Sequence, residues 1–247
     1  MDIHHFGYDK DQEEQESRPE WSCGATGGGL PLVMNPQVFT GTFPPASVIH
    51  PPPGTIQIIE GPMGSGKSTY LIRYVETHGR HLPVLFINHS SDNRDGDDVP
   101  VSSRSLLVSS DTIRKLNATY LKVSKLSEVD PKVLEKHSTV IIDEAQFFSD
   151  LVEEVTRYAE DLGKTVIAAG LLSDYNRKPF GQLLDLMRLA DSHVTLEGLC
   201  DDCLLEGRKT KSQFTRALVK MAQQKVIGKD IFRGCCRACW LKYGGEP

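Results

Sequence analysis

Apolar and polar residues follow a βα rhythm along the chain from Thr55 onward. Five short runs rich in β-branched residues predict strands, at 55–60, 83–88, 138–143, 165–170 and 193–198. The segments between them are typical of helices, most clearly SDLVEEVTRYAEDLG at 149–163, where Ser149 can cap the start and Gly163 can end the helix. Near-continuous apolar strands that alternate with helices indicate a parallel sheet covered on both faces. The pattern therefore predicts an α/β fold with a parallel-sheet core.

Residues 1–53 do not follow this rhythm. The segments GATGGGLP and TFPPASVIHPPPG are dense in Gly and Pro, and proline cannot donate the hydrogen bonds of a strand ladder. Such a composition cannot bury enough apolar surface to fold alone. The pattern predicts a disordered acidic, Pro/Gly-rich arm at 1–53 ahead of a folded core at 54–198.

Charge and hydropathy narrow the function classes. The formal net charge of −5 argues against a general nucleic-acid binder, which usually carries a strong basic excess. No run approaches the roughly 18 apolar residues that a membrane helix needs, and the acidic N-terminus is unlike a secretory signal or transit peptide. We expect a cytoplasmic protein that binds neither nucleic acid nor membrane. A basic excess at 198–247 is either a solvated face or a balance for phosphates or thiolates.

The segment GPMGSGKST follows the first predicted strand and precedes a predicted helix. It matches the phosphate-binding loop pattern, in which glycines let backbone N–H groups converge on the phosphates of a nucleotide. Lys67 would bridge the β- and γ-phosphates, and Ser68 would hold Mg²⁺. The loop predicts binding of ATP with Mg²⁺.

The segment IIDEAQFF places two carboxylates together at the end of an apolar run. Successive side chains on a strand point to opposite faces, so Asp143 and Glu144 would have different tasks. Asp143 ends the strand where a second magnesium ligand is expected. Glu144 could reach a nucleophile opposite the γ-phosphate, and a kinase that acts on an alcohol gains from such a general base.

Four of the six cysteines form two pairs, Cys200-x-x-Cys203 and Cys236-x-x-Cys239. Two such pairs in a cytosolic protein predict one tetrahedral structural Zn²⁺ site. The metal would clamp the base of a long loop, which defines a small subdomain at 199–247. Cys235 is adjacent to a ligand, but only Cys236 keeps the two-residue gap to Cys239.

These features together resemble the type II thymidine kinases, the cytosolic, bacterial and viral group. The likeness runs from about Thr55 to Tyr243 and rests on segments in family order: GPMGSGKST, SSDNR, VSSR, DEAQFF, RKPFG, VIG and the two cysteine pairs. It implies a RecA-like P-loop core with a zinc-clamped lasso, and ATP-dependent phosphorylation of thymidine to thymidine 5′-monophosphate. It also implies a homotetramer that is inhibited by the end-product triphosphate.

The resemblance implies roles for individual residues. Glu144 would be the general base for the 5′-hydroxyl, with Ser68 and Asp143 on the magnesium side. ATP would be bound by Gly61, Pro62, Met63, Gly64, Ser65, Gly66, Lys67, Ser68, Asp92, Asn93, Arg94, Asp143 and Gln146. Thymidine would be bound by Met63, Phe147, Leu171, Tyr175, Phe180, Thr210, Gln224, Lys225, Val226, Ile227, Gly228 and Phe232.

Several positions depart from the family pattern. Ala145 stands where Gly is common, Leu172 where Asp is frequent and Phe232 where Tyr is expected, and the VIGG stretch lacks one glycine. The catalytic carboxylate is untouched by these changes, which bear on the strictness of base recognition.

Two other interpretations use the same motifs. The tetrad Asp-Glu-Ala-Gln also occurs in helicases, which would need a second nucleotide-closing domain and would hydrolyse ATP in response to DNA. Alternatively, the zinc element could be a nucleic-acid ribbon, which would bind DNA tightly and in a salt-sensitive way.

Overall fold

The computed structural model describes residues 53–79, 82–92, 117–219 and 231–244. Contacts divide the chain into two units, Met1–Ala46 and Ser47–Pro247, and every described residue belongs to the second. The predicted arm therefore lies outside the described residues, apart from Pro53. The predicted boundary between the core and the zinc-binding subdomain stays a prediction.

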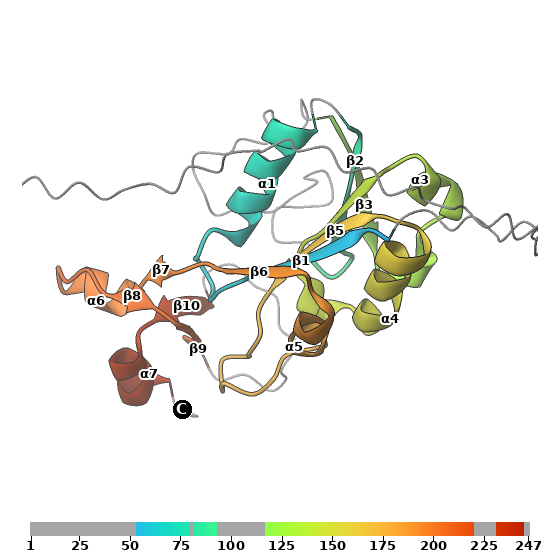
Figure 1. The fold of residues 1–247 in the computed structure, drawn as a ribbon. Coiled ribbons are helices and arrows are strands. Elements are labelled where there is room, and N and C mark those ends of the chain that lie inside the picture. Colours follow the sequence, from blue (N-terminus) through green and yellow to red (C-terminus); the bar gives the residue numbers. More distant parts are fainter. Residues whose placement is uncertain (1–52, 80–81, 93–116, 220–230, 245–247) are drawn as a thin grey trace, which may run out of the picture. The chain divides into compact units, whose positions relative to one another are not determined.

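Six strands form the core sheet in the order β3-β2-β4-β5-β1-β6 (Figure 1). Every neighbouring pair is parallel, so the carboxyl ends of all six strands meet at one edge. Their bounds are β1 Thr55–Glu60, β2 Val84–His89, β3 Ala118–Val123, β4 Thr139–Ile142, β5 Thr165–Gly170 and β6 Ser192–Thr195. Strand β5 separates β1, which precedes the phosphate loop, from β4, which precedes the acidic pair. The predicted α/β fold with a parallel-sheet core is confirmed.

Helices cover both faces of this sheet. Successive residues of a strand point to opposite faces, so neighbouring residues of β4 pack into different clusters. Ile141 joins the cluster that contains Leu71 of α1 (Lys67–His78). Its neighbour Ile142 joins the cluster that contains Val155 of α4 (Leu151–Thr156). Figure 1 shows α1 on one side of the sheet and α4 and α5 on the other. This explains the near-continuous apolar runs, since a strand covered on both faces has no solvated side.

The remaining helical elements of the core are short. They are η1 Leu126–Glu128, α3 Pro131–Glu135, η2 Ala145–Phe147, the π-helical turn η3 Arg157–Asp161, α5 Leu183–Leu186 and η4 Met187–Leu189. Among the described residues, none of the helices combines the length and the apolar character needed to cross a membrane.

Two antiparallel strand pairs and two helices form what we call the C-terminal module, residues 198–219 and 231–244. The strands β7 (Gly198–Leu199) and β8 (Lys211–Ser212) pair with each other, as do β9 (Phe214–Ala217) and β10 (Phe232–Cys235). The helices are α6 (Asp201–Leu205) and α7 (Arg237–Tyr243). This module carries the four cysteines of the predicted zinc site.

Three elements differ from the sequence pattern. Strand β3 was not predicted, because its residues are mostly half-buried at an edge of the sheet and lack a continuous apolar run. The run at 193–198 is two strands, since β6 ends at Thr195 and β7 starts at Gly198. The helix at 149–163 begins at Leu151, with Asp150 instead of Ser149 at its N-cap position. Its last turns are π-helical before Gly163, whose φ of +62° ends the helix.

Tyr158 offers a test of the packing on this face of the sheet. Its side chain is fully buried, and its hydroxyl donates a 2.7 Å hydrogen bond to the Leu126 carbonyl. That carbonyl also accepts the Val129 N–H, so Tyr158→Phe removes one of two bonds. We expect the free energy of unfolding to fall by about 1 kcal/mol, measured by urea denaturation. Tyr74→Phe, at a half-buried tyrosine of α1, should cost less, and equal costs would contradict this assignment.

Candidate active site

The phosphate loop, residues 61–66, connects β1 to α1. Gly66 occupies the N-cap position of α1 with φ +91°, a left-handed conformation that glycine adopts without strain. The buried Lys67 folds back over the loop, and its Nζ donates to the carbonyl oxygens of Gly61 (2.8 Å) and Pro62 (3.0 Å). The predicted loop residues therefore lie together, and the Lys67 ammonium group is hydrogen-bonded to the first two residues of the loop.

Asp143 and Glu144 lie in a turn after β4, and Glu144 has a left-handed backbone conformation. Strand β4 ends at Ile142, and Glu144 has φ +53° and ψ +40°. A left-handed conformation is uncommon for a residue other than glycine and occurs often at functional sites. Asp143 Oδ1 accepts the Glu144 N–H at 3.0 Å. A strained turn, and not strand alternation as the sequence suggested, separates the two carboxylates.

The carboxamide of Gln146 holds Glu144 in place. Its Nε2 donates to Glu144 Oε2 at 2.6 Å, and its Oε1 accepts the Leu171 N–H at 3.0 Å. Gln146 is 1% exposed and Glu144 is 8% exposed, so both bonds lie in a low-dielectric environment that strengthens them. One side chain thus joins the turn after β4 to the residue that follows β5.

The segment that contains RKPFG packs against this turn. Gly181 has φ +64°, and a Cβ at that position would overlap the Gln146 carbonyl oxygen. Phe180, which precedes it, forms an apolar cluster with Phe147 and Leu171, and Met63 of the phosphate loop packs against this cluster. The rings of Phe147 and Phe180 meet edge to face, with centroids 5.4 Å apart. Four residues predicted to contact thymidine are therefore brought together.

The loop at 173–179 is shaped by Asp174. Its Oδ1 accepts the N–H groups of Asn176 (2.9 Å) and Lys178 (2.8 Å), and Arg177 has φ +61°. Contacts with aromatic rings join this loop to the C-terminal module. Tyr175 lies against Phe232, with ring centroids 6.0 Å apart, and the Arg177 guanidinium lies 3.5 Å from the ring centroid of Trp240.

A buried polar pair lies at the carboxyl end of β2, with Asn88 in the strand and Asp92 three residues after it. Asn88 Nδ2 donates to Asp92 Oδ2 at 3.1 Å, and both residues are 1% exposed. Asp92 was predicted from the resemblance, whereas Asn88 was missed. Its signal in the sequence was a single amide at the end of the apolar run VLFIN.

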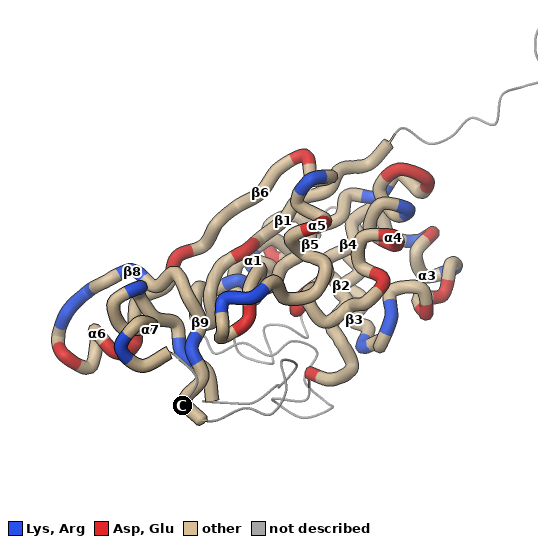
Figure 2. Tube along the Cα trace, turned by 90° about the horizontal axis from the view of Figure 1, so that it is seen from below, with Lys and Arg blue, Asp and Glu red and all other residues tan. Residues whose placement is uncertain are grey.

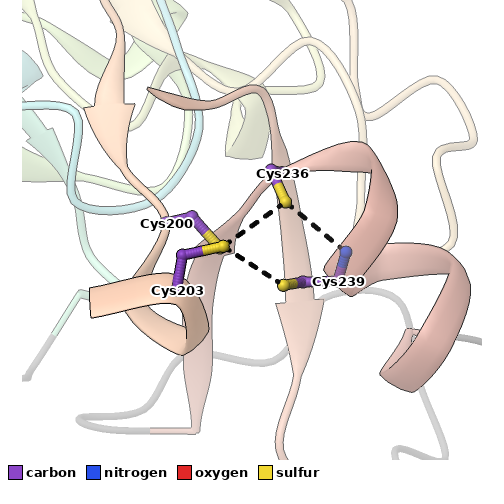
Figure 3. A group of neighbouring side chains, drawn as sticks. All are labelled: Cys200, Cys203, Cys236 and Cys239. Atoms are coloured by element: carbon purple, nitrogen blue, oxygen red, sulfur yellow. Dashed lines mark hydrogen bonds between the residues drawn. The ribbon is translucent and has the colours of Figure 1, made fainter. Parts of the chain in front are cut away.

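The four cysteine sulfurs of the C-terminal module lie within 4.8 Å of one another (Figure 3). Cys203 Sγ is 3.8 Å from Cys236 Sγ and 3.6 Å from Cys239 Sγ. Tetrahedral Zn²⁺ with Zn–S bonds of about 2.3 Å requires sulfur separations of about 3.8 Å. The same separations are far too long for a disulfide. The group of Cys200, Cys203, Cys236 and Cys239 therefore fits a Zn²⁺ site, as predicted, and Cys235 is not part of it.

Two arginines of this module lie close to a buried aspartate. Asp202, which lies between the first two cysteines, accepts hydrogen bonds from Arg216 at 2.8 and 2.5 Å and lies 3.7 Å from Arg233. The Arg216 hydrogen bonds hold the pKa of Asp202 below its usual value, against the opposing effect of burial. Figure 2 shows basic positions along β8, β9 and α7 and acidic positions on α6. Part of the positive charge of this module is therefore neutralised by an acidic residue of the same module.

Several predicted residues take no part in these contacts or cannot be placed. Asn93, Arg94 and the lasso stretch Gln224, Lys225, Val226, Ile227 and Gly228 lie outside the described residues. Thr210 is half-buried, and its carbonyl accepts the Cys200 N–H at 2.7 Å. Sequence analysis also missed Thr215 and Trp240, which contact the phosphate loop and the 173–179 loop; an isolated threonine or tryptophan gives no signal of such a contact.

Comparison with known proteins adds the relatives of this chain. The family model described as thymidine kinase matches residues 54–240. The thymidine kinase of variola virus (isolate Human/India/Ind3/1967) is 35% identical over 189 residues, which cover 76% of this chain and 97% of the viral protein. The thymidine kinase of vaccinia virus (strain Western Reserve) is 35% identical over 190 residues, with the same coverage.

Among solved structures, a DnaB-like replicative helicase aligns with a TM-score of 0.39 at 14% identity, covering 63% of this chain and 50% of that chain. The family match includes the phosphate loop, the acidic turn and all four clustered cysteines. The chain therefore belongs to the thymidine kinase family and is a phosphotransferase.

Proposed function

We propose that the protein transfers the γ-phosphoryl group of ATP to the 5′-hydroxyl of thymidine, with Glu144 as the general base. A chain of contacts supports this assignment. Glu144 is hydrogen-bonded to Gln146, which is hydrogen-bonded to Leu171. Leu171 belongs to the apolar cluster against which Met63 of the phosphate loop packs. A single buried network thus links the proposed base, the apolar cluster and the loop that would hold the nucleotide.

Proton and phosphoryl movements follow from this arrangement. The Glu144 carboxylate takes the proton from O5′ as the new O5′–P bond forms and the bond between the γ-phosphorus and the departing ADP breaks. Lys67 stabilises the charge that develops on the phosphate oxygens. The Ser68 hydroxyl and the Asp143 carboxylate would hold Mg²⁺, which prefers oxygen ligands and would supply positive charge to offset that of the phosphates.

The apolar cluster of Phe147, Leu171, Phe180 and Met63 would hold the pyrimidine ring. Tyr175 and Phe232 would close its other side, because they contact each other across the loop at 173–179 and β10. We propose that the lasso stretch 224–228 reads the edge of the base through backbone groups, as the resemblance implies. The family resemblance is also the ground for proposing a cytoplasmic homotetramer.

The role of Glu144 is tested by Glu144→Gln, which keeps the shape of the side chain and removes the base. Turnover should fall by about 10²–10⁴-fold, while the Kd for ATP stays within a few fold. The matched control is Glu153→Gln on the exposed side of α4, which should behave like the unmodified enzyme. Near-normal turnover of Glu144→Gln would assign the base elsewhere.

We further propose that the four clustered cysteines hold a structural Zn²⁺. Metal analysis of the purified protein should find about one Zn²⁺ per chain. Cys203→Ser and Cys236→Ser should lose both the metal and thymidine binding, because Trp240 and Phe232 of the same module contact the 173–179 loop. Cys235→Ser should keep the metal, as the sulfur of Cys235 lies outside the cluster. Fully active protein without zinc would contradict the proposal.

Base selectivity follows from the proposed reading of the pyrimidine edge. Thymine presents an N3–H donor between two carbonyl acceptors, whereas cytosine presents an acceptor at N3 and a donor amine. Backbone groups cannot rotate to suit cytosine, so each mismatched buried group costs about 1–3 kcal/mol. We expect kcat/KM for thymidine to exceed that for deoxycytidine by about 10⁴-fold, with deoxyuridine between them. A ratio below about ten in a steady-state assay would mean that the lasso does not read this edge.

A further inference from the structure

Met63 belongs to two parts of the site at once. Its backbone is the third residue of the phosphate loop, and its side chain packs against Phe147, Leu171 and Phe180. Whatever fixes the backbone of this one residue therefore affects both the phosphate loop and the apolar wall.

The C-terminal module contacts both polar groups of the Met63 backbone. The Met63 N–H donates to Thr215 Oγ1 at 3.0 Å, and Thr215 is 5% exposed. The Met63 carbonyl oxygen faces Gly234 so closely that a Cβ at Gly234 would lie 2.6 Å from it. Thr215 and Gly234 are directly opposite each other in the β9–β10 ladder. One cross-strand pair thus holds the two sides of a single loop residue.

A second contact reinforces the first. A Cβ at Gly198 of β7 would lie 3.3 Å from the Gly64 carbonyl oxygen and 3.4 Å from Ser65 Cα. The first cysteine pair starts directly after β7, and β10 leads into Cys236 and Cys239. Two of the three strands that touch the phosphate loop, β7 and β10, therefore lead directly into the four-cysteine cluster.

We propose that Thr215 is a positioning residue for recognition of the thymine base, and that through it the C-terminal module sets the position of the Met63 side chain. The inference rests on the proposed function, since the apolar cluster is taken to hold the base. Thr215 offers the acceptor that fixes the Met63 N–H, and the absence of a side chain at Gly234 leaves room for the Met63 carbonyl. Together they keep the Met63 side chain in the apolar cluster.

The informative substitution is Thr215→Val, which keeps the volume and removes the acceptor. An unsatisfied buried N–H should displace Met63, so kcat/KM for thymidine should fall about tenfold. The kcat/KM for deoxyuridine should change less than about threefold. The reason is that the Met63 side chain would contact the 5-methyl group of thymine, which deoxyuridine lacks. The thymidine-to-deoxyuridine ratio should therefore fall. A purely structural role would lower both values equally, and an unchanged ratio would overturn the proposal.

Three other variants make the result specific. Thr215→Ser keeps the acceptor and should restore the ratio, whereas Gly234→Ala should lower it by pressing on the Met63 carbonyl. Thr156→Val is the matched control, because its hydroxyl is buried and has no hydrogen-bond partner among the described residues, and it should have no effect. Zinc content and thermal midpoint confirm that each variant is folded. A lowered thymidine-to-deoxyuridine ratio in folded Thr215→Ser or Thr156→Val would contradict the assignment.

A readout without turnover separates this inference from the proposed function. The chain has five methionines, so methyl-¹³C-methionine spectra of the full zinc-loaded protein are simple, and Met63→Leu assigns the Met63 signal. Thr215→Val should shift that signal, and Thr215→Ser and Thr156→Val should not. An unmoved signal overturns the positioning role even if the enzyme phosphorylates thymidine. A moved signal in a protein that does not phosphorylate thymidine supports positioning while refuting the proposed function.

Discussion

The buried carboxamide of Gln146 is the interaction on which the geometry of this site depends. It donates to the Glu144 carboxylate and accepts from the Leu171 backbone, so one side chain fixes the proposed base relative to the apolar cluster. An amide has both a donor and an acceptor, and no apolar or purely acidic side chain of this size could make both bonds. A side chain at Gly170 or Gly181 would collide with Gln146, so the glycines at both positions leave room for it.

The strained backbone of Glu144 also depends on the hydrogen bond from Gln146. A glutamate with φ +53° costs free energy that the surrounding structure must offset, and the hydrogen bonds of Gln146 and Asp143 to this residue do so. The turn brings a carboxylate away from the line of β4, whereas Asp143 stays at the end of the strand. This arrangement is compatible with the two separate roles proposed for them, Asp143 toward magnesium and Glu144 toward the nucleophile.

The C-terminal module acts as a second support for the site. It contacts the phosphate loop through Thr215 and Gly234 and the 173–179 loop through Trp240, whose Nε1 donates to the Tyr175 carbonyl at 3.0 Å. A small module with so few buried apolar residues is stabilised poorly by hydrophobic burial alone. Its four cysteines, which fit a structural zinc, supply the remaining stability in this interpretation.

The sequence by itself determined the parallel-sheet class, the phosphate loop, the acidic pair and the four-cysteine group, since each depends on local pattern or fixed spacing. Tertiary structure decided the rest. Strand β3 was missed because an edge strand is only half-buried, and the turn at Glu144 was missed because a glutamate carries no local signal for a left-handed backbone. The contact of Met63 with Thr215 joins residues 152 positions apart. No periodicity or motif encodes such a pair, because it forms only when the C-terminal module packs against the loop.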